Sequence, residues 1–324
     1  MVTRLMRNYE RNGLADDASL YPAPGALIDI GGRSLHIQKQ GAGPATVVLE
    51  AGIAASSLSW RLVDAEIAKF ATVYSYDRAG LGWSPYNDRP KIARDLIEEM
   101  RLVLTAAQVP TPRIVVGHSF GGMLMRMYAS MYPEEVAGVV LVDALTAEEW
   151  FPLDSRRTRI LQRATQLSRR GIWLAERGIV RFALHSVERG SWMIPSILSK
   201  LSGAGRMNVP QKISGQIQKL PPDVRRQVRA HWSRATSFRT MSEYLANLPA
   251  SCAQAQLCPD LGGTPLIVLA AEQGDDGNQG RQAKLAKLSR RGDFRVVPGA
   301  GHWILLDKPQ AVIEAVHDLV IALP

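Results

Sequence analysis

Short apolar runs separated by helix-like stretches are the feature of this sequence that most limits its fold. Six such runs occur along the chain: Thr46–Glu50, Val73–Tyr76, Ile114–Val116, Val139–Val142, Leu266–Leu269 and Phe294–Val297. Patterns of helical period accompany them: Leu62–Phe70, Ile92–Ala107, Phe120–Met131, Ala283–Ser289 and Ala311–Ala322. Apolar strands that alternate with helices form a mainly parallel β-sheet with helices on both faces. The sequence therefore predicts an α/β fold.

Two segments depart from this alternation. Near the start, Leu27–Ile30 and Ser34–Lys39 flank a pair of glycines, which predicts a hairpin at an antiparallel edge of the sheet. From about residue 146 to 259, helical periodicity continues without a convincing strand. An insertion of this size between two strands predicts a helical cap over the carboxyl edge of the sheet, where open α/β sheets bind ligands.

The chain therefore divides into four expected segments. They are an N-terminal extension (1–25), the first part of the core (26–145), a helical cap (146–259) and the second part of the core (260–324). The extension carries Arg4, Arg7 and Arg11 but no apolar run behind them, which argues against a signal peptide. Cys252 and Cys258 are expected as free thiols in a reducing compartment, and we expect a cytoplasmic protein.

Positive charge is concentrated in the expected cap. The whole chain has a net charge of +9, whereas residues 151–250 hold 18 Lys and Arg against 5 Asp and Glu. Two interpretations stay open: solvated faces of amphipathic helices, or a basic surface for anionic lipid or an acidic substrate. Aromatic residues are not interleaved with Lys and Arg in a recognised motif, so we expect no nucleic-acid partner.

One segment of the cap predicts which of its side chains face the sheet and which face solvent. Ile172–Leu184 pairs apolar positions with arginines at helical spacing, which is typical of a single amphipathic helix. Its inward members are expected to be Trp173, Leu174 and Phe182, and its outward members Arg177 and Arg181. Such a cap would provide an apolar pocket for an acyl chain and a basic exterior.

A glycine-rich turn carries the first catalytic candidate. Gly117-His118-Ser119-Phe120-Gly121 fits the pattern G-x-S-x-G, with an apolar strand directly before it and a helical pattern directly after it. A serine at such a turn is held in strained backbone geometry that lifts its Oγ above the sheet, and the flanking glycines remove Cβ clashes. We therefore expect Ser119 to be a nucleophile.

Four segments together resemble the α/β-hydrolase family, in the order expected for it. They are the serine turn, Val48–Ile53 at the oxyanion loop, Ser75–Ser84 at the turn after the fourth strand, and Pro298–Trp303 at the histidine loop. The resemblance covers nearly the whole chain outside the first 25 residues and the cap. One departure is Glu50-Ala51-Gly52, where many members have His-Gly. Asp77 and Arg78 are expected to form a buried structural pair.

The resemblance implies the base and the oxyanion-binding groups. His302, in the glycine-rich loop after the last strand, would take the proton of Ser119. The backbone N–H groups of Phe120 and Ile53 would bind the negative oxygen of a tetrahedral intermediate. His118 is expected to pack within the turn, with its side chain away from Oγ. This chemistry requires no cofactor and no metal.

The carboxylate that would orient the base has two main candidates. The family usually supplies it from the loop after the seventh strand, where Asp275 would fit only after a small shift. Asp143 directly follows the sixth strand, a place from which some relatives deliver the acid. We expect Asp143, with Asp275 as the alternate acid, while Asp276 and Glu272 remain open.

The resemblance implies a serine hydrolase that cleaves a carboxylic ester, or a related acyl bond, of a small-molecule substrate through an acyl-enzyme. A serine nucleophile disfavours the haloalkane dehalogenase and epoxide hydrolase branches, which use Asp there. Two alternatives stay open. One is a ligand-binding protein of the same fold with little turnover. The other is a lipase whose basic, Trp-bearing cap associates weakly with an anionic membrane surface.

Overall fold

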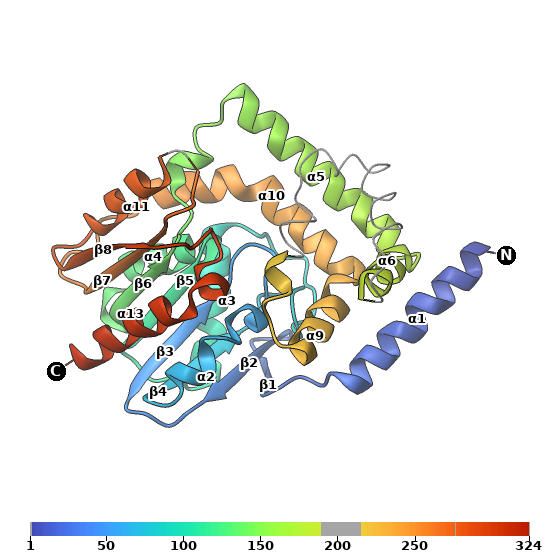
Figure 1. Cartoon of the computed structure of the whole chain (residues 1–324), viewed down its shortest axis with the longest axis horizontal. Helices are drawn as coiled ribbons and strands as arrows, with labels where there is room; N and C mark the ends of the chain where they lie inside the picture. Colours follow the sequence, from blue (N-terminus) through green and yellow to red (C-terminus); the bar gives the residue numbers. More distant parts are fainter. Residues whose placement is uncertain (1, 189–214, 276, 324) are drawn as a thin grey trace.

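A mainly parallel sheet forms the centre of the molecule. The computed structural model describes residues 2–188, 215–275 and 277–323. Within these residues, eight strands form one sheet in the order β1-β2-β4-β3-β5-β6-β7-β8 (Figure 1). They are β1 (Ala26–Asp29), β2 (Ser34–Gln40), β3 (Ala45–Glu50), β4 (Ala71–Tyr76), β5 (Arg113–His118), β6 (Val136–Val142), β7 (Leu266–Ala271) and β8 (Gly292–Val297). Only the β1–β2 and β2–β4 pairs are antiparallel, which confirms the predicted fold class.

The central strands are apolar throughout because both faces of the sheet are covered. Every residue of β3, β5 and β7 is buried. Along β5, Val115 joins the core on one face, whereas Ile114 and Val116 join the core on the other face, as the period of two in a strand requires. Gly117 at the end of β5 pairs with Glu50 of β3 and Leu141 of β6, so the carboxyl ends of these three strands lie together.

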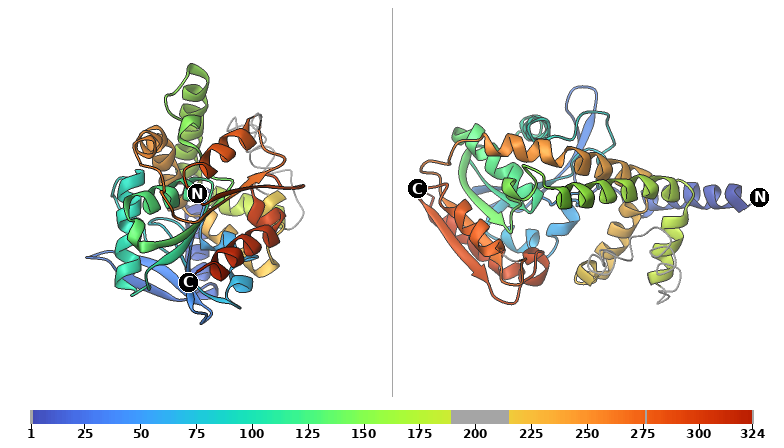
Figure 2. Two further views of the ribbon diagram at one scale, coloured as in Figure 1. Left: turned by 90° about the vertical axis from the view of Figure 1, so that its left-hand side faces the viewer. Right: turned by 90° about the horizontal axis from the view of Figure 1, so that it is seen from above.

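Helices cover the sheet in two layers. On one face lie α3 (Ala93–Ala106) and α4 (Phe120–Met131), and on the other face lie α2 (Asp64–Ile67) and α13 (Pro309–Ile321) (Figures 1 and 2). The short α12 (Ile304–Asp307) precedes α13. The expected helix Leu62–Phe70 is reduced to the single turn of α2. After β7, α11 (Asn278–Ala286) begins earlier than expected because its first turn is polar and shows no apolar periodicity.

The long insertion between β6 and β7 is helical where the structure describes it. Its helices are α5 (Ser155–Ala175), α6 (Ile179–Glu188), α9 (Pro222–Trp232) and α10 (Ala235–Gln256). Residues 189–214 of the expected cap, which include Trp192, lie outside the described residues. The long helices α5 and α10 lie side by side above the sheet in Figure 1. Tyr244, Leu248 and Cys252 of α10 are buried in the same core cluster as α3 and α4.

The segment expected as one helix over Ile172–Leu184 is two helices, and three of its five assigned side chains lie opposite to expectation, whereas Leu174 and Arg177 are partly buried. Gly178, with φ of 72°, separates α5 from α6 in the left-handed conformation that commonly ends a helix. Trp173 and Phe182 are 52% and 45% exposed, whereas Arg181 is only 5% exposed. The prediction was wrong because Arg181 has a buried partner that local periodicity does not reveal.

That partner is an N-terminal helix, α1 (Val2–Leu20), formed by the expected extension. Arg181 donates hydrogen bonds to Glu10 at 2.9 Å and to Asp17 at 2.6 Å, and all three side chains are buried. A Cβ on Gly13, between the two acids, would lie 2.6 Å from the Arg181 side chain. Glycine at this position therefore lets α1 approach α6 closely (Figure 1).

None of the helices among the described residues combines the length and the apolar character needed to cross a lipid bilayer. Cys252 and Cys258 are both free thiols, the first of them buried and the second partly buried.

Candidate active site

The serine turn lies at the carboxyl end of β5. Ser119 connects β5 directly to α4 with φ of 54° and ψ of −120°, a conformation that costs a non-glycine residue about 1–3 kcal/mol. The turn is held by close backbone packing: a Cβ on Gly121 would lie 2.4 Å from the carbonyl oxygen of Ala51. A Cβ on Gly117 would likewise lie 2.4 Å from the carbonyl oxygen of Gly121. The glycines of the motif therefore allow the serine to adopt its strained geometry.

Three side chains that are far apart in the sequence meet at this turn. His302 Nε2 lies 3.0 Å from Ser119 Oγ, and His302 Nδ1 lies 2.6 Å from Asp143 Oδ2. Because a carboxylate only accepts hydrogen bonds, Nδ1 carries the proton, and Nε2 of a neutral ring is then free to accept from Oγ. Ser119 is nearly buried, whereas the His302 side chain is 48% exposed.

Asp143 is held rigidly beside the histidine. It follows β6 with φ of 42°, and its Oδ1 accepts from the Ala271 N–H at 3.0 Å and from Asn278 Nδ2 at 2.8 Å. Burial opposes ionisation of Asp143, but the hydrogen bond and charge of His302, together with the two other donors, lower its pKa below the ordinary value. Asn278 was missed in the sequence, because nothing local marks the first residue of α11 as a partner of β6.

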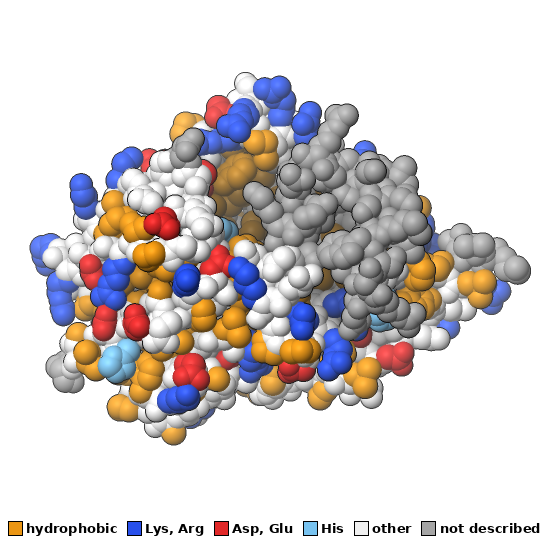
Figure 3. All heavy atoms as spheres, viewed as in Figure 1, with side chains coloured by type: hydrophobic (Ala, Val, Ile, Leu, Met, Phe, Trp, Pro, Cys, Tyr) orange, Lys and Arg blue, Asp and Glu red, His pale blue; other side chains and the backbone are white. Residues whose placement is uncertain are grey.

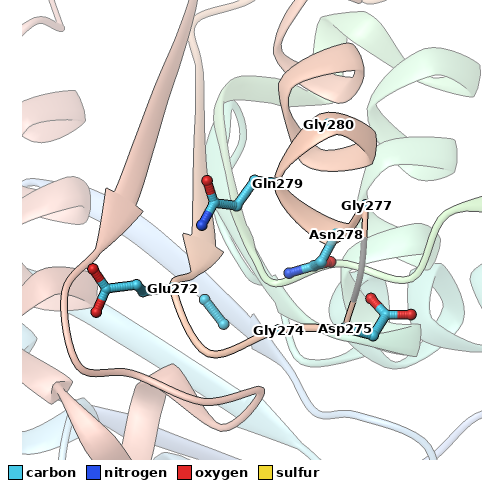
Figure 4. A pocket seen from close by; sticks show the side chains of 8 residues that line it. Glu272, Gly274, Asp275, Gly277, Asn278, Gln279 and Gly280 are labelled. Atoms are coloured by element: carbon cyan, nitrogen blue, oxygen red, sulfur yellow. The ribbon is translucent and has the colours of Figure 1, made fainter.

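The other candidate carboxylates have different partners. Asp275 is exposed and pairs with Arg281. Glu272 accepts a hydrogen bond from the Gly299 N–H at 2.8 Å. Figure 4 shows these two side chains pointing apart around a pocket at the end of β7, with Asn278 between them. Asp276 lies outside the described residues.

His118 supports the histidine loop. Its Nε2 lies 2.9 Å from the backbone carbonyl of His302 and therefore donates to it, and its ring lies 4.8 Å from the His302 ring. Burial, followed by the proximity of His302, lowers the pKa of His118 to about 3. His118 is therefore a neutral packing residue that anchors the loop of His302.

The two backbone amides expected to bind an oxyanion belong to segments that adjoin Ser119. Phe120 is the first residue of α4, and amides of a first helical turn have no acceptor within the helix. Ile53 lies in the loop of residues 51–55, here called the β3 loop. A Cβ on Gly52 would lie 3.6 Å from Ser119 Cβ, so the β3 loop passes close to the serine.

Asp77 and Arg78 are both buried, but they do not pair with each other as expected. Asp77 lies 2.8 Å from His36 Nδ1 and accepts from two backbone amides. Arg78 instead faces Glu50 and the carbonyl of Gly52. The expectation of a pair was wrong because each side chain has its own partners in other segments of the chain.

Comparisons with known proteins agree with this fold. The chain matches the Alpha/beta hydrolase family over residues 47–315. It is 33% identical to the uncharacterized protein YqjL of Bacillus subtilis over 115 residues, which are 35% of this chain and 46% of that protein. It is 32% identical to Lipase LipV of Mycobacterium tuberculosis over 126 residues, 39% of this chain and 45% of that protein. The matched segments thus span less than half the length of these relatives.

Solved structures share the fold over most of the chain. The epoxide hydrolase CorEH superimposes with a TM-score of 0.66 at 18% identity, covering 92% of this chain and 97% of that chain. An E-2-(acetamidomethylene)succinate hydrolase gives a TM-score of 0.61 at 18% identity, covering 91% and 98%. Identities this low show the fold alone. Together with the family match over most of the sequence, they establish that this chain belongs to the alpha/beta hydrolase family.

Proposed function

We propose that this protein is a serine hydrolase that cleaves a carboxylic ester through an acyl-enzyme intermediate. The observation that carries the proposal is the unbroken hydrogen-bonded series from Ser119 Oγ through His302 to Asp143, at 3.0 and 2.6 Å. Serine alone is a weak nucleophile at neutral pH and needs a base within hydrogen-bond reach. The same series argues against a protein of this fold that only binds its ligand.

The chemistry uses only groups of the chain, the ester and water. Ser119 Oγ attacks the ester carbonyl while His302 Nε2 takes its proton, and Asp143 stabilises the resulting imidazolium. The N–H groups of Phe120 and Ile53 bind the oxyanion of the tetrahedral intermediate. Collapse of that intermediate expels the alcohol, which takes the proton from His302. Water then attacks the acyl-enzyme by the same route, releasing the acid and restoring Ser119.

Fluorophosphonate labelling combined with a series of p-nitrophenyl esters tests this proposal. We expect wild-type protein to be labelled and to turn over esters, and Ser119→Ala to lose both properties while keeping its melting temperature. Ser186→Ala, a partly buried serine on α6, is the matched control and should behave as wild type. Wild-type labelling of the Ser119→Ala variant, or binding of esters without turnover by the wild type, would refute the proposal.

As a second proposal, we propose that α5 docks the protein on an anionic lipid surface. This 21-residue helix carries six arginines and no acidic residue. Arg156, Arg159 and Arg163 are exposed and line a shallow groove together with Ile160. They lie on the side of α5 opposite the buried residues that face α10. Lys and Arg side chains gather over this part of the molecule in Figure 3.

The exposed aromatic residues favour lipid over other polyanions. Trp173, near the end of α5, is half exposed, and the Arg177 guanidinium lies 3.8 Å from the centre of its ring. Phe182 on α6 is also exposed. Tryptophan and arginine side chains with this exposure are typical of helices that lie in a membrane interface, where each basic residue adds about 1 kcal/mol.

A further inference from the structure

A buried ion pair adjoins the β3 loop, which carries one of the candidate oxyanion-binding amides. Glu50 is the last residue of β3, and Arg78 lies in the turn after β4; both side chains are 2% exposed. Arg78 Nη1 lies 3.3 Å from Glu50 Oε1, and the Tyr76 hydroxyl donates a hydrogen bond to the same carboxylate. Because burying two charges offsets most of their attraction, such a pair is weak evidence for a purely stabilising role.

Arg78 also binds the backbone of the β3 loop. Its Nη2 donates a hydrogen bond to the carbonyl oxygen of Gly52, which also accepts from the Ala55 N–H at 3.2 Å. In a planar trans peptide the C=O and the following N–H point in opposite directions. Fixing the Gly52 carbonyl on the Arg78 side therefore turns the Ile53 N–H to the opposite side of the peptide.

The conformation of the β3 loop requires such an external restraint. Ala54 has φ of 54°, a left-handed conformation that is unfavourable for a residue with a Cβ. A strained loop of this kind keeps its shape only when surrounding contacts define it. Arg78 supplies a side-chain hydrogen bond to this loop, and Glu50 holds Arg78 in place from the end of β3.

The same guanidinium lies over the ring of Phe120, the residue that carries the second amide. Its central carbon lies 5.5 Å from the centre of the Phe120 ring and 5.0 Å from the centre of the Tyr244 ring on α10. Both distances are in the range of cation–π attraction. One side chain thus joins the β3 loop, the first residue of α4 and a helix of the insertion.

We propose that Arg78, held by Glu50, is a positioning residue that fixes the N–H groups of Ile53 and Phe120 for oxyanion binding. This inference rests on the proposed function of the same site. Because the oxyanion exists only in the transition state and intermediate, loss of Arg78 should lower kcat and leave KM nearly unchanged. Affinity for a trifluoromethyl ketone, which forms a tetrahedral oxyanion on the serine, should fall with kcat.

Three variants separate this role from a general loss of folding. Arg78→Lys keeps a positive charge for Glu50 but loses the planar fork that binds two partners. Arg78→Met removes the contact entirely, and the double variant Glu50→Gln/Arg78→Met also avoids an unpaired buried carboxylate. Arg113→Met is the matched control, because Arg113 is similarly buried but is the first residue of β5, at the end of the strand away from Ser119.

We expect the double variant to lose about 10²–10³-fold in kcat with KM within about threefold, as removal of one oxyanion donor does. Arg78→Lys should retain more activity than Arg78→Met, and Arg113→Met should change melting temperature alone. An unchanged kcat in folded Arg78→Lys and in the double variant, or a loss confined to KM, would overturn the positioning role. Absence of ester turnover and labelling in the wild type would instead refute the proposed function itself.

Discussion

Asp143 pairs with His302 because of its position at the end of β6, and not merely because it is an acidic residue. Of the candidate carboxylates that the structure describes near the ends of β6 and β7 (143, 272 and 275), only Asp143 lies within hydrogen-bond distance of His302. Its backbone N–H donates to the carbonyl of Leu269 at 2.8 Å, so the neighbouring strand fixes the residue at both its backbone and its side chain. A carboxylate held in this way maintains the orientation and tautomer of the imidazole.

Replacing Asp143 by Asn should therefore lower kcat about 10²–10⁴-fold, because the imidazole loses the acceptor that orients it and stabilises its charge. Steady-state kinetics on a p-nitrophenyl ester measure the effect, with Asp275→Asn as the control that should retain wild-type kcat. Loss of activity in the Asp275 variant alone would show that the loop after β7 provides the carboxylate in solution.

His36 is a second residue whose charge is fixed by its neighbours. Its Nδ1 lies 2.8 Å from Asp77 and its Nε2 lies 2.6 Å from the carbonyl of Pro24, and both partners only accept hydrogen bonds. Burial opposes a charge on the ring, but Asp77 and Pro24 together raise the pKa of His36 above 6.5. Despite its own burial, Asp77 has its pKa lowered below 3.8 by His36 and two backbone amides.

These two shifts define a pH window for the stability that the pair contributes. The stability that His36 contributes is complete below pH 6.5 and is lost as the pH rises through the raised pKa of His36. The stability that Asp77 contributes is present above pH 3.8 and is lost as the pH falls through the lowered pKa of Asp77. His36→Gln should thus lower the free energy of unfolding by about 2 kcal/mol at pH 5 and by less at pH 9. Urea unfolding at both pH values measures this, with exposed His317→Gln as the control. A larger difference at pH 9 than at pH 5 would contradict it.

At the scale of elements, one buried arginine of the insertion binds two acidic residues of α1. Arg181 neutralises Glu10 and Asp17, which lie on one face of α1 with Gly13 between them. Leu5, Leu14 and Leu20 of α1 are exposed, so apolar contacts contribute less to its docking than a fully buried helix would gain. The buried ion cluster therefore joins α1 to α6, beside a hydrogen bond of 2.6 Å between the Tyr9 hydroxyl and His185 Nδ1.

Removing that arginine should release α1 and leave the rest of the fold intact. In Arg181→Met the two carboxylates would be buried without a partner, and α1 can avoid this cost by moving into solvent. We expect faster trypsin cleavage within residues 2–20, a small change in melting temperature and unchanged ester turnover. Arg177→Met is the control, because Arg177 lies in the same segment but stacks on the exposed Trp173 instead of binding Glu10 and Asp17. Wild-type cleavage rates in Arg181→Met would show that other contacts hold α1.

At the scale of the whole molecule, positive charge is concentrated in one segment of the sequence. Residues 151–250 carry a net charge of +13, whereas the rest of the chain carries −4. Within the described part of this segment, α5 carries six arginines and no acidic residue, so we expect an anionic surface to attract the side of the molecule that bears α5. This orientation would bring the insertion, which lies above the carboxyl edge of the sheet, toward the lipid (Figure 1).

Co-sedimentation with vesicles tests this orientation. We expect binding to phosphatidylcholine vesicles that contain phosphatidylglycerol, little binding to pure phosphatidylcholine, and weaker binding at 0.5 M than at 0.05 M salt as screening increases. Binding should fall about tenfold or more in a triple variant of α5, Arg156→Gln/Arg159→Gln/Arg163→Gln. The control is a triple variant of three exposed arginines elsewhere, Arg89→Gln/Arg94→Gln/Arg290→Gln, in which binding should fall less. Equal losses in both triple variants, or equally tight binding to a DNA duplex, would exclude α5 as a lipid-docking helix. Turnover of a short soluble ester should be unchanged in both.

The sheet, its antiparallel edge and the serine turn could be predicted from the sequence, because each depends on local preferences. Apolar β-branched runs such as Val139–Val142 can be buried only as central strands, and the strained φ of Ser119 requires glycines within a few residues. Tertiary structure alone decided which carboxylate meets His302, why Arg181 is buried and what Arg78 binds. Each of these outcomes depends on a polar partner supplied by another element, 159 residues away for Asp143 and His302 and 171 for Arg181 and Glu10. Hydrophobic periodicity carries no information about such partners, because a charged side chain is buried only where the complete fold brings an opposite charge or a hydrogen-bond partner to it.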